Sequence, residues 1–256
     1  MILEQHYLRN LASKGQRIDK RKPDEYRKVV VEKGVIEKAE GSAMVKIGDT
    51  EVVVGVKMDL GVPYPDKPDE GVMIVNAELS PIASPDFETG PPGEDAIEIA
   101  RVVDRGIREA GVIETKKLCL AGGEKVWMVN VDIHIINHSG NLIDAASLAA
   151  VTALWDARMP ELKDDKVNYG KKTSKRLPVK FKPVTVSIVR IGETLLVDPS
   201  LEEERVMDMR LSVGLKDNDN VCALQKGGSK PLSADEIESI LEVAVKKSRE
   251  LRKLIV

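Results

Sequence analysis

Residues 45–50 read VKIGDT and residues 189–194 read VRIGET, and an apolar triplet follows each of them, VVV at 52–54 and LLV at 195–197. A glycine and an acidic residue between two apolar runs are typical of the tight turn of a β-hairpin. The same hairpin pattern therefore occurs in both halves of the chain. This recurrence predicts an internal duplication of one unit that contains a sheet and helices.

Helical spacing occurs on both sides of these hairpins. Residues 2–11 predict a short amphipathic helix that stops at Gly15, and residues 142–157, which are almost all apolar and rich in alanine, predict a helix buried between layers. Ser233 and Glu236 have the spacing of a capping box before a last helix. Strand-like runs lie at 28–32, 43–47, 51–58, 73–79, 117–121, 126–136, 184–191, 194–197, 209–215 and 221–225. The sequence thus predicts an α+β fold whose two similar halves share one core.

The halves are expected to meet at a polar, lysine-rich stretch. We assign residues 1–160 to the N-terminal half with its leading helix, 161–182 to a linker, and 183–256 to the C-terminal half. The linker contains a basic run, Lys171, Lys172, Lys175 and Arg176, which is typical of a mobile solvated loop or of a contact to nucleic acid.

Composition narrows the classes of function. Charged residues make up 32 % of the chain with a net charge of -3, so nucleic-acid binding would need a local basic patch. Two cysteines, Cys119 and Cys222, are expected as buried thiols of a reducing compartment. We expect neither a signal peptide nor a membrane span, and therefore a cytoplasmic protein. Because phosphate-loop and nucleotide-binding motifs and metal-ligand spacings are missing from the sequence, no cofactor and no metal are expected.

A row of three arginines lies in the predicted helix at 94–110. Arg101, Arg105 and Arg108 are spaced i, i+4 and i+7 and share one face of that helix, roughly opposite its apolar face. Guanidinium groups in line on a packed helix suit a nucleic-acid backbone. The alternative is a solvated face on which nearby acids, Glu98, Asp104 and Glu109, pair with the arginines.

Two acidic features of the sequence are further candidate sites. Asp208 stands between two methionines at an apolar strand, where a lone acid lies on the exposed face or has a chemical role. The three glutamates at 202–204 predict a charged turn or the start of a helix.

Three segments together resemble the RNase PH family. Residues 15–21 (GQRIDKR) are similar to the family's Gly-x-Arg-x-Asp-Gly-Arg opening, with Lys20 in place of glycine, and residues 41–50 (GSAMVKIGDT) are similar to its first hairpin. Residues 145–149 (AASLA) resemble the start of its buried helix. The resemblance implies a duplicated β-β-α-β-α fold, also known as ribosomal-protein-S5-domain-2-like.

Active members of that family shorten RNA from the 3′ end with inorganic phosphate as the nucleophile, and this chain departs from their pattern. They carry a Gly-Ser/Thr-Arg triplet before the buried helix, whereas residues 137–144 here read NHSGNLID, and no arginine or lysine occurs from 126 to 151. They also begin the preceding helix with an arginine pair, where this chain has Glu94 and Asp95. Carboxylates there would repel phosphate, so no catalytic residue is assigned, and Asp208, which resembles the catalytic acid, is interpreted as vestigial or structural.

These departures are similar to those of the non-catalytic subunit type of archaeal exosomes. The resemblance implies a heterodimer with a catalytic RNase PH-like subunit, three heterodimers in a hexameric ring, RNA-binding cap subunits, and no membrane. It also implies that Arg101, Arg105 and Arg108 contact single-stranded RNA beside the active site of that catalytic subunit, hereafter the sibling. Two alternatives stay open, an autonomous phosphate-dependent 3′–5′ exoribonuclease and a structural scaffold whose arginines are held in salt bridges.

Overall fold

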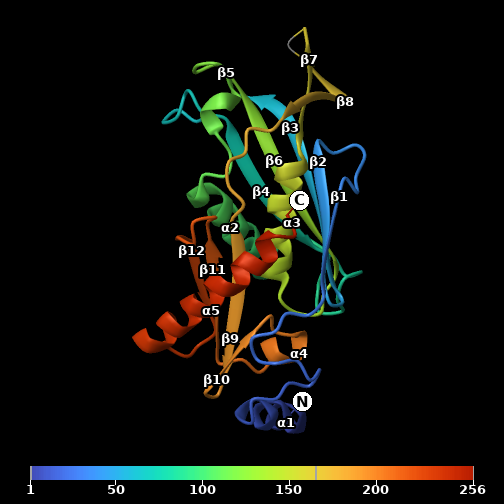
Figure 1. The fold of residues 1–256 in the computed structure, drawn as a ribbon. Helices are drawn as coiled ribbons and strands as arrows, with labels where there is room; N and C mark the ends of the chain where they lie inside the picture. Colours follow the sequence, from blue (N-terminus) through green and yellow to red (C-terminus); the bar gives the residue numbers. More distant parts are fainter. Residues whose placement is uncertain (1, 165, 256) are drawn as a thin grey trace.

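The first sheet is built around the hairpin at residues 45–50 (Figure 1). The computed structural model describes residues 2–164 and 166–255. Strands β2 (Gly41–Ile47) and β3 (Thr50–Gly61) pair antiparallel across the predicted turn at Gly48 and Asp49. The strand order is β1-β2-β3-β6-β4, with β1 at Val29–Lys33, β4 at Val72–Leu79 and β6 at Lys125–Asn137; short β5 (Cys119–Ala121) pairs with β6. Only β4 and β6 run parallel among the described pairs of this sheet.

Alternation along β6 shows which face of this sheet is covered. Trp127, Val129, Val131, Ile133 and Ile135 are buried, whereas the residues between them are partly or fully exposed. Because successive side chains of a strand point to opposite faces, one face of the sheet packs on the core and the other faces outward.

The second hairpin begins a second sheet with the order β10-β9-β11-β12. Its strands are β9 (Val184–Ile191), β10 (Thr194–Val197), β11 (Met209–Leu215) and β12 (Val221–Gly227), and all the described pairs are antiparallel. Both predicted hairpins are confirmed, but the halves are not exact copies. In the first sheet the second strand of the hairpin, β3, pairs with the next strand of the sheet, β6. In the second sheet it is the first strand of the hairpin, β9, that pairs with the next strand, β11.

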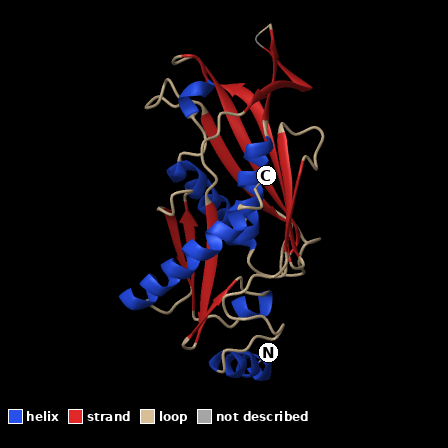
Figure 2. Ribbon diagram, viewed as in Figure 1, coloured by secondary structure: helices blue, strands red, loops and turns tan. Residues whose placement is uncertain are grey.

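Helices fill the space between the sheets and cover the second one (Figure 2). Helix α3 (Leu142–Asp156) contacts β2, β3 and β9, while α2 (Glu94–Ala110) contacts α3, β4 and β12. Helix α5 (Ala234–Arg252) contacts β9 and β11. Helices α3 and α5 both contact β9, and β9 is buried at every position but Arg190.

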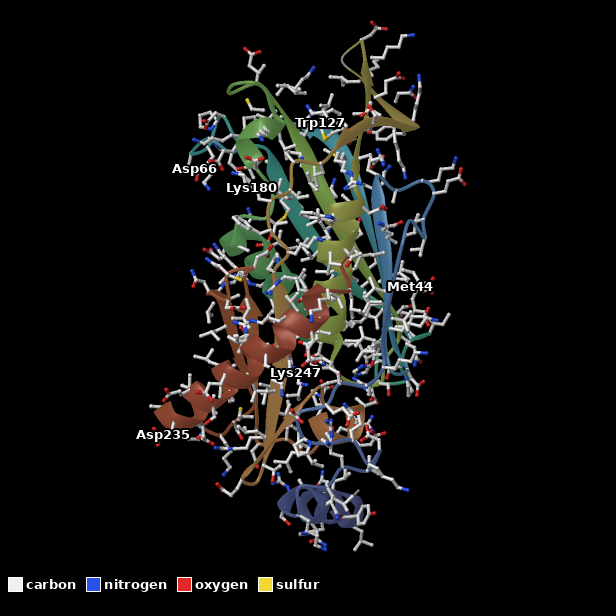
Figure 3. The ribbon with its side chains drawn as sticks, viewed as in Figure 1. Met44, Asp66, Trp127, Lys180, Asp235 and Lys247 are labelled. Carbon is white, nitrogen blue, oxygen red and sulfur yellow. The ribbon has the colours of Figure 1, made fainter. Side chains whose placement is uncertain are left out.

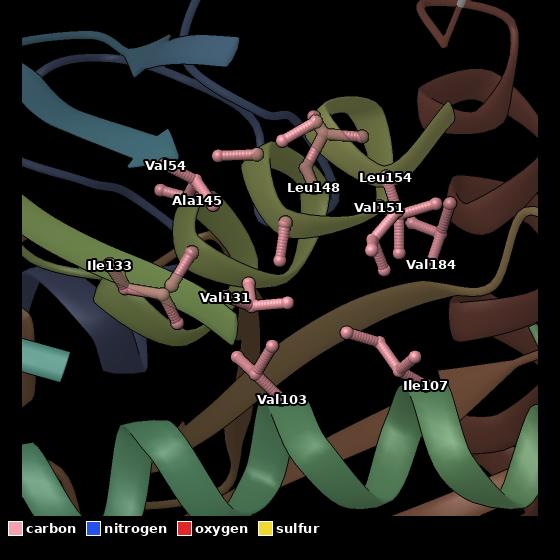
Figure 4. Close-up of a cluster of buried hydrophobic side chains, with 14 of the residues drawn as sticks. Val54, Val103, Ile107, Val131, Ile133, Ala145, Leu148, Val151, Leu154 and Val184 are labelled. Carbon is pink, nitrogen blue, oxygen red and sulfur yellow. The ribbon is translucent and has the colours of Figure 1, made fainter. Parts of the chain in front are cut away.

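Helix α3 is buried along nearly its whole length, as its alanine-rich sequence predicts. The small side chains allow a strand to approach the helix backbone closely. A Cβ added at Gly41 would lie 2.3 Å from the carbonyl oxygen of Ala153, so only glycine fits there. Figure 4 shows part of the resulting core, with Val103 and Ile107 of α2 on one side and Leu148, Val151 and Leu154 of α3 on the other.

The shorter helices follow their local signals. Helix α1 (Ile2–Ser13) ends before Gly15, whose φ is +65°, and packs Leu8 and Ala12 in a small second core against β9 and β10. Capping boxes begin α4 (Leu201–Glu204) and α5, the latter with the predicted pair Ser233 and Glu236. On α5, Lys247 (labelled in Figure 3) is buried, and its ammonium group lies 3.2 Å from the carboxylate of Glu250.

Two predictions about local structure were wrong. Residues predicted as a linker form a two-stranded ribbon, β7 (Arg158–Lys163) with β8 (Lys166–Arg176). An exposed ribbon needs no apolar face, so the alternation that identifies strands is weak there. The run at 117–121 begins as the 3₁₀-helix η1 (Thr115–Leu118) and only then forms β5. The division into halves at 160 and 183 stays a prediction.

Candidate nucleic-acid interface

The arginine row lies on the exposed side of α2. The opposite side of the helix supplies buried residues to the core, among them Ile99, Val103 and Ile107. Arg101, Arg105 and Arg108 are all exposed, as their spacing predicts. Helix packing therefore fixes the backbone that carries the three guanidinium groups.

The three arginines differ in their partners. Arg108 forms an ion pair with Asp104 at 2.7 Å and donates to the carbonyl oxygen of Met73 on β4 at 3.2 Å. Arg101 and Arg105 have no hydrogen-bond or ion-pair partner among the residues that the structure describes. The salt-bridged alternative thus fits Arg108 and not the other two.

Glu98, which was expected to pair with the row, is engaged elsewhere. Its carboxylate accepts from the Arg210 guanidinium at 2.8 Å and from the Gln225 amide at 3.0 Å. Both partners come from the second sheet, on β11 and β12. Glu98 is therefore not the partner of Arg101 or Arg105.

At the loop before α3, a carboxylate from another part of the chain occupies the position where an anion would bind. Asn141, in the left-handed region at φ 56°, precedes the helix, and its backbone N–H donates to Oε1 of Glu204 at 2.9 Å. Gly140, at φ +90°, must be glycine, because a Cβ there would lie 2.5 Å from the backbone nitrogen of Leu201. A helix N-terminus attracts anions, and here the protein's own glutamate takes that place.

A cavity of about 130 Å³ beside this loop is acidic. Its lining includes Asp95, Glu98 and Glu204 against one cation, Arg210. Burial raises the pKa of Glu204 to about 7, and burial lowers the pKa of the lining residue His138, so the imidazole is neutral at pH 7. The lining therefore holds more carboxyl groups than cations, and Asp95 is one of them.

The arginines of the segment at 15–27 form ion pairs with carboxylates of this chain and are not available to a ligand. Arg17 is buried against Glu203, and both Arg21 and Arg27 form ion pairs with the buried Asp198. Arg27 also donates to the carbonyl oxygen of Ser139 at 2.6 Å, which holds the loop before α3. Sequence reasoning missed this role, and its only signal was the family resemblance of residues 15–21.

The carboxylate of Asp208 is held by hydrogen bonds from two other parts of the chain. It directly precedes β11, its side chain is 15 % exposed, and both carboxylate oxygens accept from the Arg9 guanidinium of α1, at 3.0 and 3.2 Å. One oxygen also accepts from the backbone N–H of Gly192 at 2.7 Å. The hydrogen bonds from Arg9 hold the pKa of Asp208 below its usual range. Asp208 therefore connects α1 to the turn of the second hairpin and does not line the acidic cavity.

Other candidate chemistry is scattered over the fold. Within residues 2–164 and 166–255, no group of three His, Cys, Asp or Glu side chains is arranged to hold a metal ion. Cys119 and Cys222 are free thiols and only half-buried, less buried than the sequence predicted. None of the described helices is both long enough and apolar enough to cross a membrane.

Comparisons with known proteins agree with this geometry. Residues 25–160 match the model of the 3′ exoribonuclease family, domain 1, and residues 183–247 match its domain 2. Exosome complex component Rrp42 of Methanocella arvoryzae is 49 % identical over 250 residues, covering 98 % of this chain and 94 % of that protein. The Rrp42 protein of Archaeoglobus fulgidus is also 49 % identical over 250 residues, with 98 % and 95 % covered.

Solved structures give the same result. A chain of the Archaeoglobus fulgidus exosome with RNA bound to the active site superposes with a TM-score of 0.90 at 48 % identity, covering 98 % of this chain and 97 % of that one. A chain of an archaeal exosome core gives a TM-score of 0.88 at 45 % identity, with 99 % and 96 % covered. The predicted RNase PH-like α+β fold is thereby confirmed, and the chain belongs to the 3′ exoribonuclease (RNase PH) family.

Proposed function

We propose that this chain is the non-catalytic subunit of an archaeal exosome, a complex that degrades RNA from 3′ to 5′ by phosphorolysis in the cytoplasm. It pairs with a catalytic RNase PH-like sibling, three pairs close a hexameric ring, and RNA-binding cap subunits sit on that ring. Full-length similarity to archaeal proteins named exosome complex component Rrp42 supports this assignment.

One observation carries the RNA-binding part of the proposal. Arg101 and Arg105 are exposed on a packed helix and have no partner among the described residues. Unpaired arginines in a chain of net charge -3 suit a phosphate backbone, whose neutralisation dominates nucleic-acid affinity. In the ring, Arg101, Arg105 and Arg108 hold RNA phosphates while the sibling cuts, and the chain helps to structure the sibling's active site.

The acidic cavity supports the non-catalytic part. A phosphorolytic site must hold two anions close together, the attacking phosphate and the scissile one. Glu204 occupies the N-terminus of α3, and Asp95 and Glu98 add further negative charge. The autonomous exoribonuclease is the less favoured alternative, because these carboxylates would oppose both anions.

The test compares the chain alone with the assembled complex. Purified chain, sibling, and the two together are incubated with RNA and inorganic phosphate, and release of nucleoside diphosphates is measured. We expect no release from the chain alone and faster release from the pair than from the sibling. Phosphate-dependent shortening of RNA by the chain alone would overturn the non-catalytic assignment.

A further inference from the structure

The β7–β8 ribbon is strongly basic, unlike the chain as a whole. Residues 158–176 contain seven Lys or Arg and three Asp or Glu, a net charge of +4, while the whole chain carries -3. Lys163, Lys166, Lys172, Lys175 and Arg176 are all exposed. None of these five has an ion-pair partner within the described part of the chain; of the ribbon's lysines only Lys171 does, with Glu161 at 2.8 Å.

The strand register brings like charges together. Arg158 lies opposite Arg176 at the base of the ribbon, and Lys163 lies opposite Lys166 near its tip. Like charges directly opposite each other on neighbouring strands are destabilising. The free protein therefore carries a repulsion along this ribbon that a bound polyanion would relieve.

The ribbon is nevertheless attached to the body in one orientation. The Tyr169 hydroxyl donates to Oδ1 of Asp59 on β3 at 2.8 Å, and the Lys57 ammonium lies 5.4 Å from the Tyr169 ring centroid. Figure 1 shows the ribbon projecting at the end of the molecule opposite α1, well away from α2. Its side chains extend into the space around it (Figure 3).

We propose that the β7–β8 ribbon binds the phosphate backbone of RNA as a second contact, separate from the arginine row. This inference rests on the proposed function, because it assumes that RNA reaches the complex. Free lysines spread along an extended ribbon suit a strand of repeated negative charges. Lysine is depleted in protein–protein interfaces, which disfavours a protein partner for the same surface.

The experiment uses the assembled complex with the triple variant Lys166→Gln, Lys172→Gln and Lys175→Gln in this chain. The control is Lys14→Gln, Lys230→Gln and Lys253→Gln, which removes three charges from exposed lysines whose ammonium groups also have no partner among the described residues. Affinity for a single-stranded RNA of about 30 nucleotides, a span of several binding sites, is measured as a function of salt. We expect roughly tenfold weaker binding at low salt and a salt slope reduced by about 2, since each contact contributes about 0.7. The control should match the parent complex.

The Arg101→Gln, Arg105→Gln variant in the same assay separates the two proposals. If it weakens binding while the ribbon variant does not, the ribbon proposal is wrong and the proposed function stands. If neither variant changes affinity, the RNA-binding part of the proposed function fails as well. If the ribbon variant no longer assembles with the sibling or cap subunits, the ribbon is a protein interface and the proposal is overturned.

A second measurement does not depend on any variant. Hydrogen exchange at residues 158–176 of the parent complex should slow when RNA is added, because the polyanion relieves the repulsion between the paired cations. Unchanged exchange at saturating RNA would contradict the proposal.

Discussion

The backbone N–H of Asn141 donates a hydrogen bond to the carboxylate of Glu204 over 2.9 Å, and this contact joins the N-terminus of α3 to α4. The donor and the acceptor are 63 residues apart in the sequence. The protein has therefore placed its own carboxyl group at the helix end that faces the acidic cavity.

Glu204 should make the protein less stable as pH rises. Burial raises the pKa of Glu204 from 4.5 to about 7, so the folded state binds a proton more tightly than the unfolded state. Stability from this group is full below pH 4.5 and is lost as pH rises toward 7. In the parent protein we expect the free energy of unfolding to fall by on the order of 2 kcal/mol across that window because of this group. In the Glu204→Gln variant this fall should be absent, as measured by urea unfolding at several pH values.

The control for this prediction is Glu193→Gln, an exposed glutamate at the second hairpin turn. It should keep the parent pH dependence. Asp144, whose pKa burial raises to about 6, should leave a smaller slope of the same sign in the Glu204→Gln variant. A pH profile unaffected by Glu204→Gln would show that the carboxylate is already ionised at low pH.

Because Arg108 forms an ion pair and Arg101 and Arg105 do not, we expect substitution of the three arginines to differ in its effect on RNA affinity and on stability. Arg101→Gln and Arg105→Gln should each weaken RNA binding by the assembled complex and lower the salt slope by about 0.7, while leaving unfolding unchanged. Arg108→Gln should also lose about 0.5 kcal/mol of stability, since it breaks the pair with Asp104. RNA affinity unchanged by the paired substitution of Arg101 and Arg105 would favour the scaffold alternative.

The sequence predicted the helix that carries the row because every local signal agrees there. A loop rich in proline, residues 80–93, leads into it, Gly111 ends it with a left-handed φ of 68°, and its apolar residues share one face. The bounds of α2, Glu94–Ala110, coincide with the prediction. Which acids pair with which arginines was not predictable, because Glu98 is engaged by Arg210, 112 residues away.

The ribbon and the cavity were missed for a different reason. Strand β8 is polar and exposed, so its hydrogen bonds to β7 leave little trace in the hydrophobic pattern. Glu204 belongs to an acidic run that predicted only a turn or helix start, and its contact with Asn141 is a product of tertiary packing. Local patterns predict elements, whereas long-range polar contacts need the fold.

Asp208 provides a test of a structural against a catalytic role. We expect Asp208→Asn to leave RNA shortening by the assembled complex unchanged and to increase hydrogen exchange in α1, because the ion pair with Arg9 is weakened. Since the pKa of Asp208 is lowered, its stabilising effect is present at neutral pH and is lost as pH falls below 3.8. A large loss of RNA shortening with α1 still protected would instead assign Asp208 to the chemistry.

The buried pair of Arg17 and Glu203 should matter most for stability. Their side chains are 0 % and 4 % exposed, and the guanidinium also donates to the carbonyl oxygens of Val197 and Asp198, at 2.8 Å each. Arg17→Met leaves the Glu203 carboxylate buried without its cation, which should cost about 3–5 kcal/mol in urea unfolding. Arg205→Met, which breaks the exposed pair with Asp86, should cost less than about 1 kcal/mol.

The double substitution Arg17→Met, Glu203→Gln separates the loss of the pair from the cost of the stranded charge. If the uncompensated carboxylate causes most of the loss, the double variant should recover part of it, because a neutral amide is less costly to bury than an ion. Equal costs for Arg17→Met and Arg205→Met would mean that burial does not distinguish the two pairs. In that case Arg17 does not anchor the N-terminal segment, and the ion pairs of Arg21 and Arg27 with Asp198 are the main ionic connections to that part of the chain.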